Sequence, residues 1–315
     1  MTTTRIGIIA DPGKLAQLRQ AVTNHDQVRL VANSSPDRDL PAEFSKDALD
    51  AVIISAPLAY QVHLVASALE KQLHVLSTVP AGRSVEDMIN IRRAEANAPD
   101  TVLQFGFHHR KHLSVQAAKR IFDTGDLGQL IHMRGLYGGA TPLEGQPPLL
   151  EQGLHMLDLM QMFAGPFEEV QAVIGEALSA HYGVEDNVMA VLRTNAGAMS
   201  SLHISTTQWR QTFRLELGFE RGYLWLDGLL TPEVGYAPEM LIIGRGESDE
   251  NGCPLPNPSE DVQAFEQDPS WEYVLDDFID AINGKSIASG TSLQAFDAMN
   301  IVQRIYAADH SFVPR

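Results

Sequence analysis

The chain has 315 residues, more than one hydrophobic core usually serves, so we expect two domains. Hydrophobic residues make up 44% and charged residues 20%, as in an ordinary soluble globular protein. The net charge of −17 argues against nucleic acids and anionic membranes as partners, because their phosphates would be repelled. The single cysteine, Cys253, excludes an internal disulfide, and no signal-peptide or membrane-spanning pattern is visible, so we expect a cytoplasmic protein.

Five short apolar runs alternate with helical patterns over the first third of the chain. The runs lie at residues 5–10, 28–32, 51–55, 73–76 and 101–105. Ser84, with Asp87 three residues later, predicts a capped helix start between the last two runs. This alternation predicts a Rossmann-like, doubly wound parallel sheet over residues 1–120, with ligands at the carboxyl ends of its strands.

The first strand-to-helix turn lacks the glycines that dinucleotide binding normally needs. The three fingerprint positions hold Ala10, Pro12 and Leu15. Pro12 removes an N–H donor, and Asp11 adds a negative charge where a pyrophosphate would lie. The usual ribose-binding acid after the second strand is also missing, although a serine with a nearby arginine could suit a 2′-phosphate. If a dinucleotide binds, we expect its contacts among Ala10, Gly13, Ser35, Arg38, Pro57 and Pro80.

From about residue 129 to residue 244 the sequence alternates in the manner of β-strands. The expected strands lie at 130–136, 170–174, 188–193, 199–205, 213–218, 223–226 and 240–243. Residues 245 onward read as a long loop, and two helices are expected near 271–282 and 292–308. We therefore expect an α+β domain over residues 121–315, with a large, open, mostly antiparallel sheet flanked by helices.

The stretch from Glu151 to Asp158 predicts the first turns of a helix. Glu151 and His155 are four residues apart, so they stand one above the other on one helix face. A carboxylate beside an imidazole fixes its tautomer and suits a general base. The alternative is structural, with Glu151 near a helix dipole and His155 packed on a sheet.

Two other groups of residues carry possible chemistry. His108, His109 and His112, with Glu151 and His155, could be read as a zinc or manganese site, although we expect no metal. The Trp209 ring could stack on a sugar or belong to the core at a strand end.

Several motifs, taken together, resemble one protein family along nearly the whole chain. They are Asp50-Ala-Val-Ile-Ile-Ser-Ala-Pro57, Ala68-Leu-Glu-Lys-Gln-Leu-His-Val-Leu76, Gly106-Phe-His-His-Arg-Lys-His112, Asp123-Thr-Gly-Asp-Leu-Gly128, Glu151-x-x-x-His155, Glu185-Asp-Asn187, Trp209 and Ser270-Trp271. The family that they resemble is Gfo/Idh/MocA, which includes glucose-fructose oxidoreductase and inositol dehydrogenase. The resemblance implies a Rossmann domain followed by a larger open-sheet domain through which members commonly oligomerise.

The resemblance also implies roles for individual residues. His155 matches the catalytic histidine, and Glu151 takes the place of the family's aspartate. The substrate side is expected to comprise His109, Arg110, Asp158, Asn187 and Trp209. On the cofactor side, Val79 replaces the catalytic lysine of Glu-Lys-Pro, and Leu58 replaces an asparagine.

These departures lead to three hypotheses about function. The first is an enzyme with a sugar or polyol pocket that needs no cofactor, in which His155, oriented by Glu151, serves as base for an elimination or isomerisation. The second is an NAD- or NADP-dependent sugar oxidoreductase with a divergent cofactor loop. The third is a non-catalytic sensor or partner of an active relative. In each case we expect a homo-oligomer, a dimer or tetramer, formed through the second-domain sheet.

Overall fold

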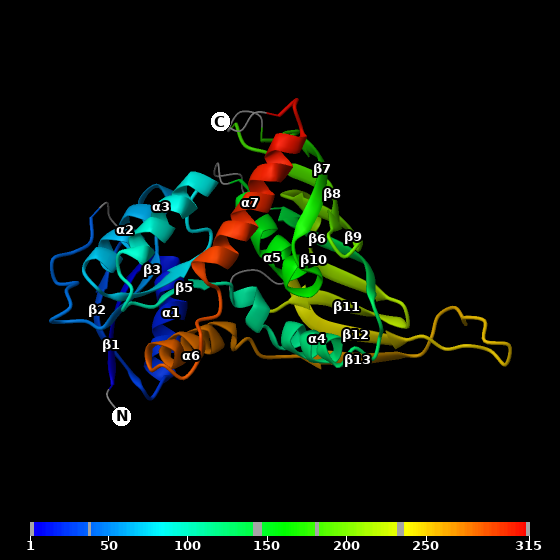
Figure 1. Cartoon of the computed structure of the whole chain (residues 1–315), viewed down its shortest axis with the longest axis horizontal. Helices are drawn as coiled ribbons and strands as arrows, with labels where there is room; N and C mark the ends of the chain where they lie inside the picture. Colours follow the sequence, from blue (N-terminus) through cyan, green and yellow to red (C-terminus); the bar gives the residue numbers. More distant parts are fainter. Residues whose placement is uncertain (1–2, 37–38, 141–146, 180–182, 232–235, 313–315) are drawn as a thin grey trace. The chain divides into compact units, whose positions relative to one another are not determined.

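The computed structural model describes residues 3–36, 39–140, 147–179, 183–231 and 236–312. The chain forms two compact units (Figure 1). The first, called here the parallel-sheet unit, comprises Met1–Lys111 and Pro269–Asn300; the second, the open-sheet unit, comprises His112–Asp268 and Ile301–Arg315. Each unit is therefore built from two separate segments of the chain. In the described ranges, no helix has the length and apolar character needed to cross a membrane.

The parallel-sheet unit contains five parallel strands, which confirms the predicted sheet. In sequence order they are β1 (Thr4–Ala10), β2 (Val28–Ser34), β3 (Ala51–Ser55), β4 (His74–Thr78) and β5 (Leu103–Gly106). Their spatial order is β2-β1-β3-β4-β5, so the chain reverses direction across the sheet next to β1. In sheets of this kind, ligands bind beside such a reversal, at the carboxyl ends of the strands.

Helices from both segments of the chain pack on this sheet. They are α1 (Pro12–Asn24), α2 (Leu58–Glu70), α3 (Val85–Ala96) and α6 (Ser270–Ile282). The Ser84 hydroxyl accepts the Asp87 N–H at the start of α3, as its sequence predicts. Helix α6 buries Val274 and Phe278 in the core formed by α1 and one face of the sheet. Residues 269–300 therefore belong to this unit, because α6 supplies part of its hydrophobic core.

The open-sheet unit contains an eight-stranded sheet, which confirms the predicted large, mostly antiparallel sheet, although only seven of its strands were predicted. The strands are β6 (Leu130–Ala140), β7 (Phe167–Gly175), β8 (Asn187–Thr194), β9 (Met199–Ser205), β10 (Thr207–Phe219), β11 (Gly222–Leu229), β12 (Tyr236–Arg245) and β13 (Glu260–Phe265). Their spatial order is β13-β12-β11-β10-β6-β9-β8-β7. Strands β6 and β9 run parallel, and the other described neighbours are antiparallel.

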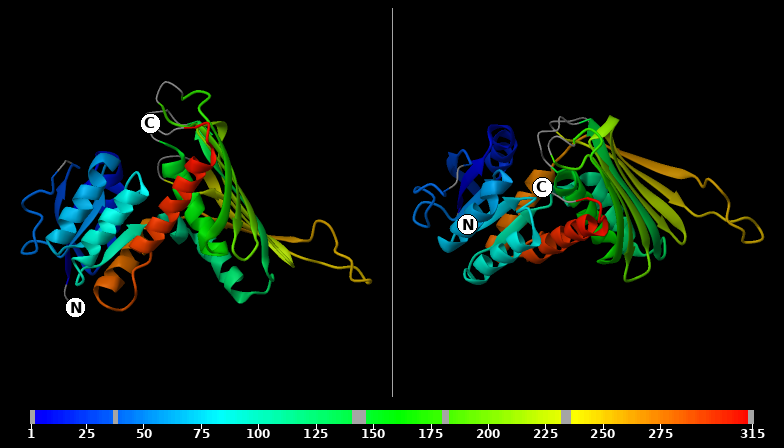
Figure 2. Two further views of the ribbon diagram at one scale, coloured as in Figure 1. Left: turned by 45° about the horizontal axis from the view of Figure 1, so that its top comes forward. Right: turned by 90° about the horizontal axis from the view of Figure 1, so that it is seen from above.

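The two faces of this sheet differ in burial. On one face, helices α4 (Leu113–Thr124) and α5 (Leu154–Ala164) pack on the strands. Strand β8 shows the alternation: Val188 and Leu192 are buried, whereas Met189 and Val191 are 56% and 60% exposed. The ribbons of the described residues show no helix over the second face, called here the open face (Figure 2).

An exposed arm joins the last two strands. Residues 245–257 are exposed throughout and project beyond the sheet (Figure 1). Strand β13 lies within the stretch that the sequence indicated as loop, because its exposed, polar residues carry little alternation. It pairs with β12 over six residues, from Glu239↔Phe265 to Gly244↔Glu260. The C-terminal helix α7 (Ser292–Ala308) contributes residues to both units.

Candidate functional site

The segment that carries Glu151 and His155 is a π-helical turn that continues directly into an α-helix. The π-helix η2 spans Leu149–Gly153, and α5 follows. The Gly153 N–H donates to the Pro148 carbonyl at 2.9 Å, five residues back, which is the π-helical pattern. The sequence indicated an ordinary α-helix here. A Cβ on Gly153 would stand 2.8 Å from Leu149 Cδ1, so the missing side chain leaves room for this turn, and such turns are frequent at functional sites.

The three candidate residues of this segment differ in burial. Glu151 and His155 are half-buried, which leaves part of each side chain accessible. Asp158 is only 2% exposed and lies deeper in the open-sheet unit. Glu151 lies in the π-helical turn and His155 in the first turn of α5, so one short segment carries both accessible side chains. The predicted contact of Asp158 with a substrate stays a prediction.

A pair of polar side chains beside this segment was not recognised in the sequence. Gln152 Nε2 lies 3.5 Å from the Tyr236 hydroxyl, and Gln152 Oε1 is buried with no hydrogen-bond partner among the described atoms. The Tyr236 ring packs edge-on against Tyr137. Burial raises the pKa values of both tyrosines, so their hydroxyls stay protonated. A hydroxylated ligand would find a donor and an acceptor here, but nothing in the local sequence pattern links residues 152 and 236.

Asn187 and Trp209 lie on the sheet strands β8 and β10. Asn187 Nδ2 donates to Asp186 and to the Thr207 hydroxyl, and its Oδ1 lies 3.4 Å from His203 Nε2, a residue that alternates with buried positions of β9. Its side chain therefore points toward the open face. Trp209 is 96% exposed. Their predicted roles in substrate binding remain untested.

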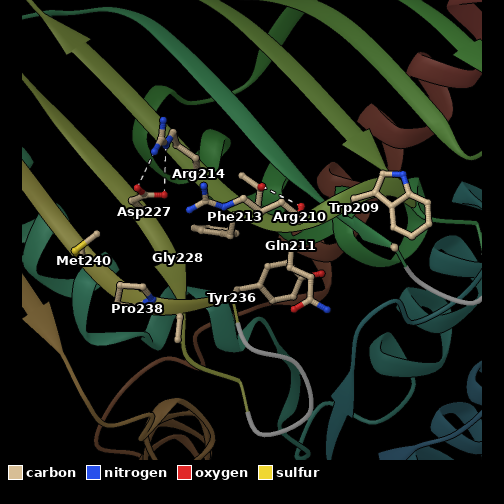
Figure 3. A pocket seen from close by; sticks show the side chains of 13 residues that line it. Trp209, Arg210, Gln211, Phe213, Arg214, Asp227, Gly228, Tyr236, Pro238 and Met240 are labelled. Atoms are coloured by element: carbon tan, nitrogen blue, oxygen red, sulfur yellow. Dashed lines mark hydrogen bonds and ion pairs between the residues drawn. The ribbon is translucent and has the colours of Figure 1, made fainter.

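A cavity of about 570 Å³ lies over one end of β10, β11 and β12. Trp209, Arg210, Gln211 and Tyr236 line it together with the Arg214–Asp227 ion pair (Figure 3). Gly228, with a φ of 78°, lies at a bulge where any Cβ would overlap the Pro238 carbonyl oxygen at 1.9 Å. The bulge thus needs glycine. Trp209, which was expected either to stack on a sugar or to belong to the core, lies at the rim of this cavity and not in the core.

In the parallel-sheet unit, the turn after β1 presents the N-terminus of α1. Asp11 is its N-cap but makes no side-chain capping hydrogen bond, and Pro12 occupies the first turn. Helix geometry leaves the N–H groups of Gly13 and Lys14 without an intrahelical acceptor. Nothing lies within 4 Å of the position of a Cβ on Gly13. Backbone donors beside open space are the arrangement that binds phosphate at helix N-termini, so a dinucleotide fits this turn in spite of Asp11.

A buried glutamine connects the carboxyl ends of β3, which neighbours β1, and of β4. Gln61 Oε1 accepts the Ala56 N–H at 2.7 Å, and its Nε2 donates to Ser77 Oγ at 2.8 Å and to the Thr78 carbonyl at 3.2 Å. These groups are at the carboxyl ends of β3 and β4, next to Pro57 and Pro80. Gln61 has no exposed surface. It therefore sets the spacing of two predicted cofactor-contact residues, although the sequence offered no reason to select it.

The other predicted residues of this unit are distributed as follows. Ala10 is the last residue of β1 and is buried, whereas Ser35 follows β2 and is exposed. Arg38 lies outside the described residues. In the 3₁₀ turn η1 (His108–Lys111), His109 is 3% exposed, and Arg110 donates to Gln294 at 3.1 Å.

A parallel nucleotide-type sheet combined with an open antiparallel sheet defines a two-unit, oxidoreductase-like fold. The family model for the GFO/IDH/MocA C-terminal domain matches residues 115–225. Inositol 2-dehydrogenase from Corynebacterium glutamicum is 23% identical over 182 residues, which are 56% of this chain and 54% of that protein. These matches support membership of the Gfo/Idh/MocA family. It spans about half the length of the curated relatives that it matches.

Two solved structures share the fold over nearly their whole length. UDP-N-acetylglucosamine 3-dehydrogenase from Acidithiobacillus ferrooxidans superimposes with a TM-score of 0.82 at 15% identity and covers 99% of both chains. The WlbA dehydrogenase from Bordetella pertussis, in complex with NADH and UDP-GlcNAcA, gives 0.78 at 16% identity, covering 99% of this chain and 97% of that one.

These relatives correct the first functional hypothesis. The expectation of an enzyme that uses no cofactor, and performs elimination or isomerisation, is wrong: the similar proteins are dehydrogenases, and one contains NADH. The expectation relied on the fingerprint glycines missing at Ala10, Pro12 and Leu15, and on Leu58 and Val79 in place of the family's asparagine and lysine. However, phosphate binding at this turn depends mainly on backbone N–H groups, which Gly13 and Lys14 still supply.

Proposed function

We propose that this chain is an NAD- or NADP-dependent oxidoreductase that acts on a CH–OH group of a sugar or polyol. The observation that carries the proposal is the η2–α5 segment, which presents a half-buried Glu151 and a half-buried His155 four residues apart. The dehydrogenases that resemble this chain act, by their names, on inositol and on a UDP-sugar, which supports a polyhydroxylated substrate.

In the proposed reaction, His155 accepts the proton of the substrate hydroxyl as a general base. Glu151, four residues earlier, orients the imidazole ring. A bound nicotinamide supplies the hydride acceptor. The Gly13 and Lys14 N–H groups would hold its pyrophosphate, with Ser35, Pro57 and Pro80 nearby at the strand ends. Since Val79 is buried and has no ionisable group, it cannot share the proton transfer with His155.

The test uses the full-length chain. NADH and NADPH binding is followed by fluorescence, and turnover is measured with NAD⁺ and NADP⁺ on myo-inositol, D-glucose, methyl glucosides and UDP-N-acetylglucosamine. We expect binding of one cofactor in the micromolar range and reduction of that cofactor with at least one substrate class. Absence of binding even at millimolar cofactor would refute the proposal.

We further propose that the chain forms a homo-oligomer through the open face. Exposed apolar side chains gather there on β7, β8 and β9, including Val173 at 72% and Val191 at 60% exposure. A depression of about 640 Å³ crosses the same face. Apolar surface of this kind is stabilised by a partner that removes it from water.

The charges on the open face favour a second copy as the occupant. Three cross-strand ion pairs join neighbouring strands on it: Arg134–Glu216 at 2.6 Å, Arg214–Asp227 at 2.7 Å and Arg193–Glu169 at 3.2 Å. Each charge is compensated within its own chain, although the chain as a whole carries −17. Two copies can therefore approach through this face with less repulsion than through other surfaces.

A further inference from the structure

We propose that Glu185 and Tyr306 are positioning residues that hold η2 and so direct Glu151 and His155 toward the substrate. This inference rests on the proposed function, but its first test does not need activity. Neither residue is part of the proton-transfer pair. They act on it through the backbone of Leu149, two residues before Glu151.

The contact consists of two hydrogen bonds to one carboxylate oxygen. Glu185 Oε1 accepts the Leu149 N–H at 3.1 Å and the Tyr306 hydroxyl at 2.8 Å. Glu185 is 1% exposed and Leu149 is fully buried. A side chain just before β8 thus joins the start of η2 to α7, across 36 and 121 residues of sequence.

The first N–H groups of a helix have no acceptor inside the helix. In η2, the N–H groups of Leu150 and Glu151 donate to the Pro147 carbonyl, and that of Gly153 donates to Pro148. The Leu149 N–H instead uses Glu185, and without it a buried donor would lose its partner. Glu185 therefore fixes the residue at which the π-helical turn begins.

The other end of η2 is fixed by close packing. A Cβ on Gly153 would lie 3.3 Å from Ile204 Cγ1 of β9, so the backbone is held against the sheet. With both ends fixed, the turn keeps its π register. A shift by one residue would rotate a side chain by roughly a quarter of a turn around the helix axis, enough to separate Glu151 from His155.

The protonation states of the pair are compatible with this role. Burial raises the pKa of Glu185, although the hydrogen bonds from Tyr306 and the Leu149 amide oppose that rise. Burial and the neighbouring Glu185 raise the pKa of Tyr306, which stays a donor. The two hydrogen bonds from Leu149 and Tyr306 need an acceptor oxygen at residue 185, and a glutamine amide also supplies one.

The experiment compares Glu185→Leu, Glu185→Gln and the milder Tyr306→Phe by hydrogen–deuterium exchange of the full-length protein. In Glu185→Leu, we expect peptides covering residues 147–156 to exchange about tenfold faster, in line with the cost of a buried, unpaired N–H. Glu185→Gln should preserve protection, and Tyr306→Phe should fall between. Arg304→Met is the matched control, because Arg304 on α7 donates to the Phe167 carbonyl at 2.7 Å and not to η2.

Kinetics then test the link to function. Glu185→Leu should lower kcat by about 10²-fold through misplacement of the base, with KM within about threefold, and glutamine should restore it. Adding Glu151→Gln to Glu185→Leu should produce little further loss, because both changes remove the same support. If the wild-type chain oxidises no substrate, the proposed function fails. The exchange result still shows whether Glu185 and Tyr306 hold η2. Unchanged exchange over 147–156, or an equal rise in the strands and in Arg304→Met, would show that Glu185 is only a general stabiliser.

Discussion

His112 Nδ1 lies 2.9 Å from Glu239 Oε2, and neither side chain has any surface exposed to solvent. The same carboxylate accepts the Ser114 N–H at the start of α4 and the Leu230 N–H after β11, each at 3.0 Å. One buried anion therefore connects a helix N-terminus, a strand and a loop of the open-sheet unit. Its hydrogen bonds compensate for its removal from water.

We predict that Glu239→Gln destabilises the chain by about 3 kcal/mol at neutral pH, since it removes a buried carboxylate that is hydrogen-bonded to His112 and to two backbone N–H groups. Burial alone would raise the pKa of Glu239, but the bond to His112 and the backbone donors hold it below the usual 4.5. A lowered folded pKa adds stability above the unfolded pKa, and this stability is lost as pH falls through the folded value. Urea unfolding should thus show the wild-type advantage shrinking below about pH 4.5.

The matched control for this prediction is Glu260→Gln, an exposed glutamate that accepts the Tyr223 hydroxyl at 2.6 Å. It should change the free energy of unfolding by less than about 1 kcal/mol. Equal effects of the two substitutions, or an advantage of Glu239 that grows in acid, would contradict the assigned role of the buried pair.

Gln61→Leu should weaken cofactor binding as well as folding. It leaves the Ala56 N–H without its acceptor, which costs about 1–3 kcal/mol of stability, and it frees the ends of β3 and β4. Gln104→Leu is the control: Gln104 is equally buried and donates to the Val274 carbonyl at 3.0 Å, so it should lower the melting temperature only. If NADH affinity falls equally in both variants at matched stability, Gln61 has no special role at the strand ends.

Asp11→Asn should tighten NADH or NADPH binding. Asp11 is exposed and makes no capping bond with its side chain, so its removal costs little stability, while its negative charge lies where phosphate would bind. Helix-terminus charges contribute roughly 0.3–1 kcal/mol, so we expect a change of about two- to fivefold that diminishes in high salt. Asp26→Asn, beyond the other end of α1, should leave the Kd unchanged. Weaker binding in Asp11→Asn would mean that the pyrophosphate does not lie at this turn.

If the chain oligomerises through the open face, one charged substitution on that face should disrupt the oligomer. Val191→Asp should reduce the molar mass measured by light scattering at micromolar concentration, because an unpaired carboxylate would be buried in the contact. Val31→Asp, at a 44% exposed valine on β2 of the parallel-sheet unit, should leave the mass unchanged. A wild-type chain that is already a monomer would contradict the proposed contact.

Local sequence patterns were sufficient to predict both sheets apart from β13. The apolar residues 188–192 mark β8 as a strand, and the apolar residues 51–54 mark β3 as a buried parallel strand. Which face of β8 is covered could not be predicted, because both of its faces carry apolar side chains. The dependence of the parallel-sheet unit on α6 was not predictable in this way. Helical periodicity shows that α6 has an apolar face, but not which sheet that face will cover.

The candidate site could be predicted only in part, because local sequence patterns do not show contacts between distant residues. The spacing of Glu151 and His155 is local and could be recognised, whereas Gln61, Tyr236 and Glu185 act through contacts between distant residues. The prediction that no cofactor binds was wrong because it relied on missing glycines and replaced side chains, whereas the backbone N–H groups at the start of α1 do not depend on them. A sequence pattern shows which residue types are present. The direction of a backbone N–H group can be inferred from it only where the start of a helix can be located.

His155→Asn should separate catalysis from folding. If His155 is the base, its replacement should reduce kcat by about 10²–10⁴-fold with an unchanged melting temperature, because the side chain is only half-buried. Glu151→Gln should act in the same direction but more weakly, since it removes orientation and charge and leaves the base in place. If His155 is instead a packing residue, the asparagine variant should lose roughly 1–3 kcal/mol of stability and affect ligands only through that loss. Melting temperature, NADH affinity and turnover measured on the same two variants distinguish these cases. Full turnover in a well-folded His155→Asn protein would remove this segment from the active site.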